Sequence, residues 1–326
     1  MTVVAADGHA PRVIEEAAYE TAFLALMDSL ACGFKALHDP ACTKLLGSLV
    51  PGATMAFGAR VPGTSLQLDP VQAAFNIGTM VSWLQTNDPA LTTVCGHLSD
   101  SLGAILAVAD YRARKAIAEG ASPPTVRDLS ATLLDAHEHA LLEWSRSVRL
   151  SGAAMATEAT DALASVSARC ALTRIASAAS AASLLGGSRV QVAAAAALAR
   201  SESHAAAHAA AAPNLAMQEP WRIGDATSRG VRLALLALAV QSAPESPSPS
   251  SDEAALQREV KAGLDRNWWA TVATPEAESR IRDRFAACVA SHFPTVQAGK
   301  IALMFADRVK LEALPVNELV SMMVRN

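Results

Sequence analysis

Alanine dominates two long stretches of the chain, residues 157–185 and 188–212, and a Gly186-Gly187 pair separates them. Alanine is the strongest helix former, so both stretches are predicted to be helices. Hydrophobic residues make up 51% of the 326 residues, whereas aromatic residues make up only 4%. Small side chains on closely approaching helices must therefore fill the core, which favours an all-α fold with a substantial interior.

Apolar residues at helical spacing predict the remaining helices. These span residues 15–37, 70–84, 102–115, 125–150 and 226–240, followed by three closing helices around residues 275–291, 295–309 and 315–324. Asp225 is expected to cap the helix 226–240, which is nearly all apolar and should be central and covered on most sides. We find no strand-like alternation of useful length and no repeat of constant period.

Charge and cysteine usage narrow the class of protein. The formal net charge of −4 gives no electrostatic footprint for nucleic acid, so no nucleic-acid partner is expected. The five cysteines are scattered without a CxxC pair, which predicts reduced and mostly buried thiols. The sequence shows no signal-peptide pattern and no apolar run of the roughly 20 residues that span a bilayer. We therefore expect a cytoplasmic protein with no membrane span.

An irregular polar segment, residues 87–101, lies between two of the predicted helices. Ser99 or Asp100 is expected to cap the second of them. This would place His97 beside exposed backbone N–H groups and the positive end of the helix dipole, where a histidine can meet an anion. On this segment alone, a loop histidine bound to a backbone carbonyl is the simpler interpretation.

The other histidines carry weaker signals. His137 and His139 flank Glu138 and are predicted to point to different sides of their helix, at surface or boundary positions. His204 and His208 are four residues apart, a spacing that suits metal ligands on a helix. No carboxylate follows at the usual spacing, so no metal is predicted. No phosphate-binding glycine loop, dinucleotide fingerprint or nucleophile elbow is present, and no cofactor is predicted.

Several long blocks of the sequence resemble one protein family. In chain order they are Leu30–Phe34, Val50–Gly52, Ala59–Thr64, Asp69–Met80, Asn87-Asp88 with Gly96-His97 and Ser99-Asp100, Gly224–Arg229 and Leu311–Val316. They are similar to blocks of the MmgE/PrpD family, which includes 2-methylcitrate dehydratase, cis-aconitate decarboxylase and iminodisuccinate epimerase, and the 2-methylcitrate dehydratase branch is most similar. The resemblance implies a helical domain built from the N-terminal part and the C-terminal tail. It also implies an inserted α/β lid domain, with the active site where the two domains meet.

The lid is expected to be missing from this chain. A Pro/Ser tract at residues 242–251 cannot hold a helix and indicates a flexible linker. Only residues 242–274, a linker and a short helix, stand where the family places a domain on the order of a hundred residues. Residues 1–241 would then form the main part of an MmgE/PrpD-like helical bundle, and residues 275–326 would complete it.

The retained domain also departs from the family pattern. His97 stands at the position of the family's loop histidine, and Asp88 keeps its spacing. Arg169 falls where the family has a second active-site histidine, Glu219 where it has a lysine, and Ala211 where it has a further histidine. The lysine carried by the lid has no counterpart. Since losing one such group typically costs about a hundredfold in rate, efficient tricarboxylate chemistry is not expected.

Three functions are consistent with these features. The first is a repurposed enzyme that positions an apolar substrate for cyclisation or isomerisation, for example a Diels-Alder type cycloaddition in secondary metabolism, with His97 or Asp88 as polarising group. The second is a residual lyase, a dehydratase or decarboxylase, acting on a small carboxylic acid. The third is a non-enzymatic helical protein. A small-molecule substrate and a homodimer are expected. The candidate catalytic residues are His97 and Asp88, and the candidate substrate-binding residues are Asn87, Thr92, Cys95, Asp100, Ser101, Trp83, Arg169 and Trp221.

Overall fold

Helices carry almost all of the regular structure in the computed structural model, which describes residues 14–93, 95–151, 166–209, 221–240 and 274–325. The α-helices are α1 (Glu16–Ala36), α2 (Pro40–Thr43), α3 (Pro70–Ser82), α4 (Leu102–Ala118), α5 (Val126–Ser151), α7 (Val166–Leu184), α8 (Arg189–Ala209), α9 (Trp221–Ala239), α11 (Pro275–His292), α12 (Thr295–Phe305), α13 (Arg308–Ala313) and α14 (Val316–Met322). Two antiparallel pairs of two-residue strands join them, β1 (Ala59–Arg60) with β2 (Gln67–Leu68) and β3 (Thr92–Thr93) with β4 (Gly96–His97). The predicted all-α fold is confirmed.

Glycines allow the central helices α3, α4 and α9 to approach each other closely. A Cβ atom on Gly224 of α9 would lie 2.1 Å from Oγ1 of Thr79 on α3, and one on Gly103 of α4 would lie 2.8 Å from Cα of Gly78. Thr227 of α9 donates a hydrogen bond from Oγ1 to the backbone carbonyl of α3, at Ala74, over 3.0 Å. Small residues therefore set the helix spacing, as the composition predicted.

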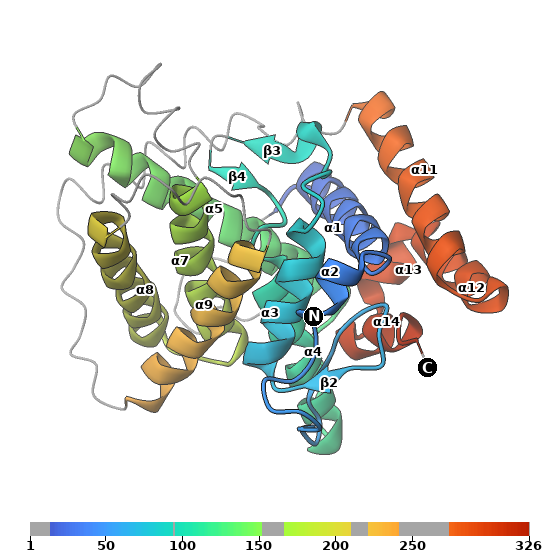
Figure 1. The fold of residues 1–326 in the computed structure, drawn as a ribbon, viewed down its shortest axis with the longest axis horizontal. Coiled ribbons are helices and arrows are strands. Elements are labelled where there is room, and N and C mark those ends of the chain that lie inside the picture. Colours follow the sequence, from blue (N-terminus) through green and yellow to red (C-terminus); the bar gives the residue numbers. More distant parts are fainter. Residues whose placement is uncertain (1–13, 94, 152–165, 210–220, 241–273, 326) are drawn as a thin grey trace.

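The C-terminal helices pack on the N-terminal ones. Figure 1 shows α11, α12, α13 and α14 gathered at the right of the view, where α11 packs on α1 and α14 packs on α4. Phe305 of α12 stacks on Phe23 of α1 at a centroid distance of 6.2 Å and contacts Phe285 of α11 at 4.5 Å. The backbone N–H of Val126, at the start of α5, donates to the carbonyl of Leu314 over 2.8 Å. These contacts join the two ends of the chain in one hydrophobic core.

Three details of the predicted helices were wrong. Helix α9 begins at Trp221, so Asp225 lies inside it and is exposed instead of capping it. Leu235 and Leu236 of α9 are 38% and 48% exposed, because the neighbouring helices cover only the opposite side. The second closing helix is in fact two, since Asp307 accepts a hydrogen bond from the backbone N–H of Lys310 and starts α13.

The cysteines and the hydropathy of the helices agree with what the sequence predicts. All five cysteines are free and buried, as predicted. Among the described residues, no helix combines the length and apolarity that a bilayer span requires.

Candidate active site

Residues 87–101 form a short hairpin that connects α3 to α4. A single 3-10 turn, η1 (Pro89–Leu91), leads into β3, and β4 returns with Thr92 paired to His97. Buried Leu91 and Leu98 anchor the two sides, and the backbone N–H of Leu98 donates to the carbonyl of Leu91 over 3.1 Å. The segment predicted as an irregular loop is therefore held in place at its centre.

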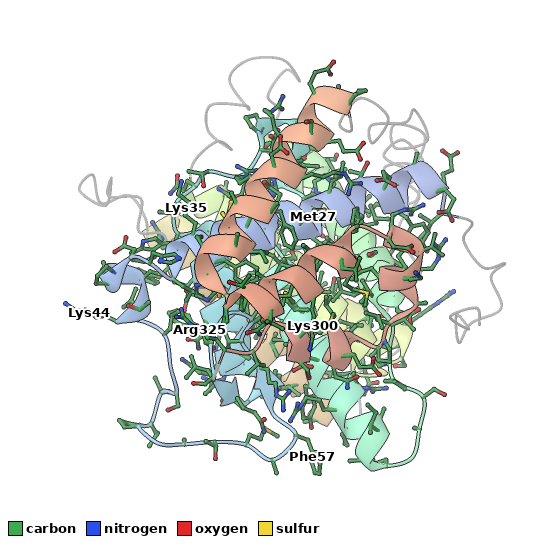
Figure 2. The ribbon with its side chains drawn as sticks, turned by 90° about the vertical axis from the view of Figure 1, so that its right-hand side faces the viewer. Met27, Lys35, Lys44, Phe57, Lys300 and Arg325 are labelled. Carbon is green, nitrogen blue, oxygen red and sulfur yellow. The ribbon has the colours of Figure 1, made fainter. Side chains whose placement is uncertain are left out.

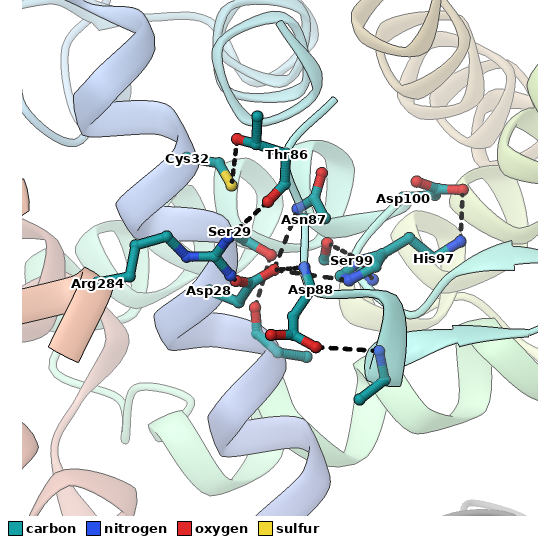
Figure 3. A network of polar contacts seen from close by, with 12 residues as sticks. Asp28, Ser29, Cys32, Thr86, Asn87, Asp88, His97, Ser99, Asp100 and Arg284 are labelled. Carbon is teal, nitrogen blue, oxygen red and sulfur yellow. Dashed lines mark hydrogen bonds and ion pairs between the residues drawn. The ribbon is translucent and has the colours of Figure 1, made fainter. Parts of the chain in front are cut away.

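His97 lies inside the protein with both ring nitrogens beside polar groups (Figure 3). Nδ1 accepts a hydrogen bond from the backbone N–H of Ser99 over 3.2 Å and lies 2.6 Å from Ser99 Oγ. Because Nδ1 is the acceptor, Nε2 carries the proton in the neutral ring. Nε2 lies 3.6 Å from Oδ2 of Asp28. Burial lowers the pKa of His97 to about 4, so the ring is neutral at pH 7.

The predicted setting of His97 at an open helix end was wrong. The residue that precedes α4 is Ser101, and its side chain makes no capping hydrogen bond. The side chains of Ser99 and Asp100, the two expected caps, instead bond to His97 and to Arg169. The histidine is consequently fixed by neighbouring side chains and does not face a free anion site at the helix terminus.

Asp28 of α1 is a fully buried carboxylate that the sequence analysis missed. Its Oδ2 accepts hydrogen bonds from the backbone N–H of Asp88 over 3.0 Å and from Nδ2 of Asn87 over 3.4 Å. Arg284 of α11 forms an ion pair with Oδ1. Since a buried charge needs such partners, Asp28 links α1, the hairpin beside His97 and the C-terminal helices.

Asp88 points to a different set of partners. Its Oδ1 accepts a hydrogen bond from the backbone N–H of Ala90 over 3.0 Å, which caps η1. Arg280 of α11 donates to both carboxylate oxygens, over 3.2 and 3.3 Å. Asp28 is therefore the carboxylate nearest to Nε2 of His97, and Asp88 shapes the turn before it.

His137 of α5 is buried next to the hairpin, so its predicted surface or boundary position was wrong. Its Nε2 lies 3.1 Å from Oγ1 of Thr93 and 3.8 Å from Sγ of Cys95. The apolar stripe of α5 that includes Leu133 and Ala136 turns this face of the helix inward. Burial lowers the pKa of His137 to about 4 and raises the pKa of Cys95 to about 12. The pair is thus a neutral imidazole and a protonated thiol.

Asp100 and Arg169 form an ion pair beside His97. Arg169 of α7 donates from Nε to Oδ2 of Asp100 over 2.7 Å and from Nη2 to Oδ1. Asp100 also accepts the backbone N–H of His97 over 3.1 Å, and its charge raises the pKa of Arg169. Gly96 precedes them at φ 123°, and a Cβ there would lie 2.5 Å from Oδ2 of Asp100. Both the positive φ and the lack of room for a Cβ favour glycine at position 96.

These side chains surround a small polar pocket. Its volume is about 10 Å³, enough for one water molecule. The lining residues are Cys95, His97, Leu98, Asp100, Ser101, Ala136, His137, Ala140 and Thr173. Four of the predicted site residues, His97, Cys95, Asp100 and Ser101, meet there, and Arg169 is bonded to one of them.

The other predicted site residues lie apart from the pocket lining. Trp83, next to the end of α3, donates from Nε1 to Oδ2 of Asp39 over 2.7 Å. Thr92 is exposed on β3, and Trp221 is half-buried at the first turn of α9. The positions Ala211 and Glu219 lie outside the described residues.

The weak metal-ligand spacing found in the sequence lies on α8. His204 and His208 fall on α8, but their side chains lie outside the described part of the structure. Within that part, no three or more His, Cys, Asp and Glu side chains are grouped as metal ligands.

Comparison with known proteins places this arrangement in a family. The MmgE/PrpD N-terminal domain model matches residues 5–252. The 2-methylcitrate dehydratase of Salmonella typhimurium is 43% identical over 225 residues, which cover 69% of this chain and 44% of the relative. The mitochondrial 2-methylcitrate dehydratase of Yarrowia lipolytica is 38% identical over 230 residues, 70% of this chain and 42% of the relative. The aligned part of the chain spans less than half the length of these curated relatives. The chain belongs to the MmgE/PrpD family.

Proposed function

We propose that this protein is a lyase of the MmgE/PrpD type that removes water from a small hydroxycarboxylic acid at the His97 and His137 pocket. The observation that carries this proposal is that two buried, neutral imidazoles border one polar cavity next to the Asp100–Arg169 pair. Relatives named 2-methylcitrate dehydratase support a dehydration.

Dehydration needs one group to take a proton and another to give one. A base removes the hydrogen from the carbon beside the carboxylate, an acid protonates the leaving hydroxyl, and a carbon–carbon double bond and water are formed. His97 would take the proton at Nδ1 after the substrate displaces the hydrogen bond from the backbone N–H of Ser99, and Asp28 would then stabilise the imidazolium through Nε2–H. His137 is the second proton-transfer group. The negative charge of a bound carboxylate raises the pKa of both rings toward the working range.

Arg169 supplies the cation for the substrate carboxylate. Its side chain is 31% exposed and pairs with Asp100 at rest. A substrate carboxylate of similar geometry can share or replace this bidentate contact. Because the resting pocket holds only about one water, binding requires the hairpin or Arg169 to move.

The pocket fits a polar substrate better than an apolar one. Asp100 is paired with Arg169 at rest, and an apolar molecule could not replace such hydrogen bonds if they opened to admit it, at a cost on the order of 1–3 kcal/mol for each group. The cycloaddition hypothesis therefore requires a different cavity from this pocket. The cyclase remains the alternative function if the protein has no activity on carboxylic acids.

The resemblance also supports a lidless architecture. Residues 242–274 replace the inserted domain in this proposal, with residues 1–241 and 275–326 forming the helical domain. Contacts such as the Asp28–Arg284 pair, which join α1 to α11, are consistent with it. Without a lid to exclude water, electrostatic stabilisation of the transition state is weaker, so we expect slow turnover.

The test is incubation of the full chain with 2-methylcitrate, citrate, cis-aconitate and itaconate, followed by mass spectrometry of the products. The expected result is an unsaturated acid lighter than 2-methylcitrate or citrate by one water. Absence of any product from these acids would contradict the lyase. Cyclisation of an apolar polyene would then support the cyclase, and absence of any stabilising ligand would support the non-enzymatic protein, whose dimer is checked by light scattering.

A further inference from the structure

A second and larger cavity lies away from the hairpin. Its volume is about 790 Å³, within the range of small-molecule sites. The residues that line it include Arg60 of β1, Gln67 of β2, Gln297 of α12, Ser321 of α14 and Arg325. In Figure 1 the β3–β4 hairpin is at the top of the molecule, whereas β2 and α14 lie in its lower half. The two cavities share no lining residue.

The cavity is cationic. Arg60 and Arg325 both line it, and no acidic side chain of the described part of the chain does. Among the described residues, neither guanidinium forms an ion pair with a carboxylate. Asp110 of α4, which is buried, accepts the backbone N–H of Arg60 over 2.8 Å but forms no ion pair with its guanidinium among the described contacts. Positive charge is therefore gathered in this cavity on a chain whose net charge is −4.

The fold holds Arg60 through its side chain and Arg325 through its backbone, while the side chain of Arg325 is exposed. Arg60 donates from Nη1 to Ser321 Oγ over 2.7 Å, which leaves its other donors available. The backbone N–H of Arg325 donates to the carbonyl of Thr64 over 3.1 Å. Gln297 donates from Nε2 to the carbonyl of Val324 over 2.8 Å, so the chain just before Arg325 is fixed as well. Figure 2 looks onto α11 and α12 and labels Arg325 beside them.

We infer that this cavity binds a small phosphorylated molecule, with Arg60 and Arg325 donating to the phosphate oxygens. A guanidinium presents parallel N–H donors that match two phosphate oxygens, and two such groups suit a charge of −2. Ser321 donates its hydroxyl hydrogen to the carbonyl of Asn317 and accepts from Arg60, so it orients this guanidinium and is not itself a phosphate donor. The remaining volume accommodates the rest of a metabolite-sized ligand. This site goes beyond the proposed lyase reaction and does not depend on it.

The test is calorimetric titration of the full chain with inorganic pyrophosphate at fixed ionic strength. Wild type is compared with Arg60→Gln, Arg325→Gln and the control Arg232→Gln, which removes an exposed arginine of α9 outside the cavity. We expect binding to wild type, a loss of affinity of about tenfold or more in each cavity variant, and affinity within about twofold of wild type in the control. If Arg60→Gln does not fold, the affinity of Arg325→Gln for pyrophosphate tests the site.

Three results would overturn the inference. These are no binding to wild type, an equal loss in the Arg232→Gln control, or succinate binding as tightly as pyrophosphate, which would assign the cavity to dicarboxylates. A fourth variant, His97→Asn, should bind pyrophosphate with unchanged affinity. Because pyrophosphate binding is measured separately from product formation, a negative lyase assay does not count against the phosphate site.

Discussion

Oδ2 of Asp28 lies 3.6 Å from Nε2 of His97, and Arg284 pairs with the other oxygen of the same carboxylate. Asp28 belongs to α1, His97 to the hairpin after α3, and Arg284 to α11, so three distant segments meet at one buried group. The position of the histidine consequently depends on the C-terminal helices as well as on its own loop.

Removing Arg284 should destabilise the fold far more than removing Arg280. Arg284→Gln leaves the fully buried Asp28 without its cation, at a cost of about 3 kcal/mol or more in the free energy of unfolding. Arg280 is 58% exposed, so Arg280→Gln should cost about 1 kcal/mol or less. Urea denaturation of both variants measures the difference. Equal effects would show that the Asp28 pair does not hold α11 in place.

The stability of the protein should fall as the pH is lowered from about 6.5 to about 4. The folded-state pKa values of His97 and His137 are about 4, below the ordinary 6.5, so the unfolded state binds more protons in this interval. Each histidine contributes a loss on the order of 3 kcal/mol. Asp110 opposes this, because burial raises its pKa from 3.8 to about 6. Its effect favours the folded state as the pH falls through 6 toward 3.8.

Variants separate these contributions. Asp110→Asn should steepen the loss of stability between pH 6.5 and 4, and His137→Asn should make it shallower. Chemical denaturation at several pH values gives the free energy of unfolding for each. A variant of His137 with the pH dependence of wild type would mean that this ring is not buried in neutral form.

Gly96→Ala should destabilise the hairpin more than Gly120→Ala destabilises the end of α4. Both glycines have positive φ, but only at Gly96 does a Cβ also meet a fixed group, Oδ2 of Asp100 at 2.5 Å. We expect about 1–2 kcal/mol for Gly120→Ala and a larger loss for Gly96→Ala. Thermal unfolding compares the two, and equal shifts would argue against the observed Asp100 position.

Gly224→Ala and Gly299→Ala should have effects of opposite sign. A Cβ on Gly224 of α9 would meet Oγ1 of Thr79 at 2.1 Å and the carbonyl oxygen of Phe75 at 2.6 Å, so α9 and α3 must separate. At Gly299 of α12 a Cβ would meet no described atom within 4 Å beyond its own helix backbone, and alanine there should add up to about 1 kcal/mol through helix propensity. Melting temperatures test both; a tolerated Gly224→Ala would contradict the close helix crossing.

Local pattern was enough to predict the fold class and most helices. Alanine content, apolar spacing and glycines placed α1, α3, α4, α5 and the closing helices near their observed positions. The error at α9 arose because an apolar helix was assumed to be covered, although coverage depends on neighbours that sequence spacing does not reveal.

The candidate site was predicted only where its residues are close in sequence. His97, Cys95, Asp100 and Ser101 come from one segment and meet in one pocket. Asp28 and His137 were missed, because each lies on a different helix, far in sequence from the segment 87–101. Only the packing of α1 and α5 against the hairpin brings these two residues to His97.

In the proposed dehydration, His97 takes a proton from the bound acid and His137 is the second proton-transfer group. The most direct measurement is kcat for dehydration of 2-methylcitrate by wild type, His97→Asn, His137→Asn and the control His139→Asn. His139 lies on the same helix as His137, outside the pocket, and its Nδ1 lies 2.8 Å from the carbonyl oxygen of Asp135. We predict losses of about a hundredfold or more in the two pocket variants and a rate within about twofold of wild type in the control. Pocket variants that keep the wild-type rate, or a wild type that forms no product, would contradict the account.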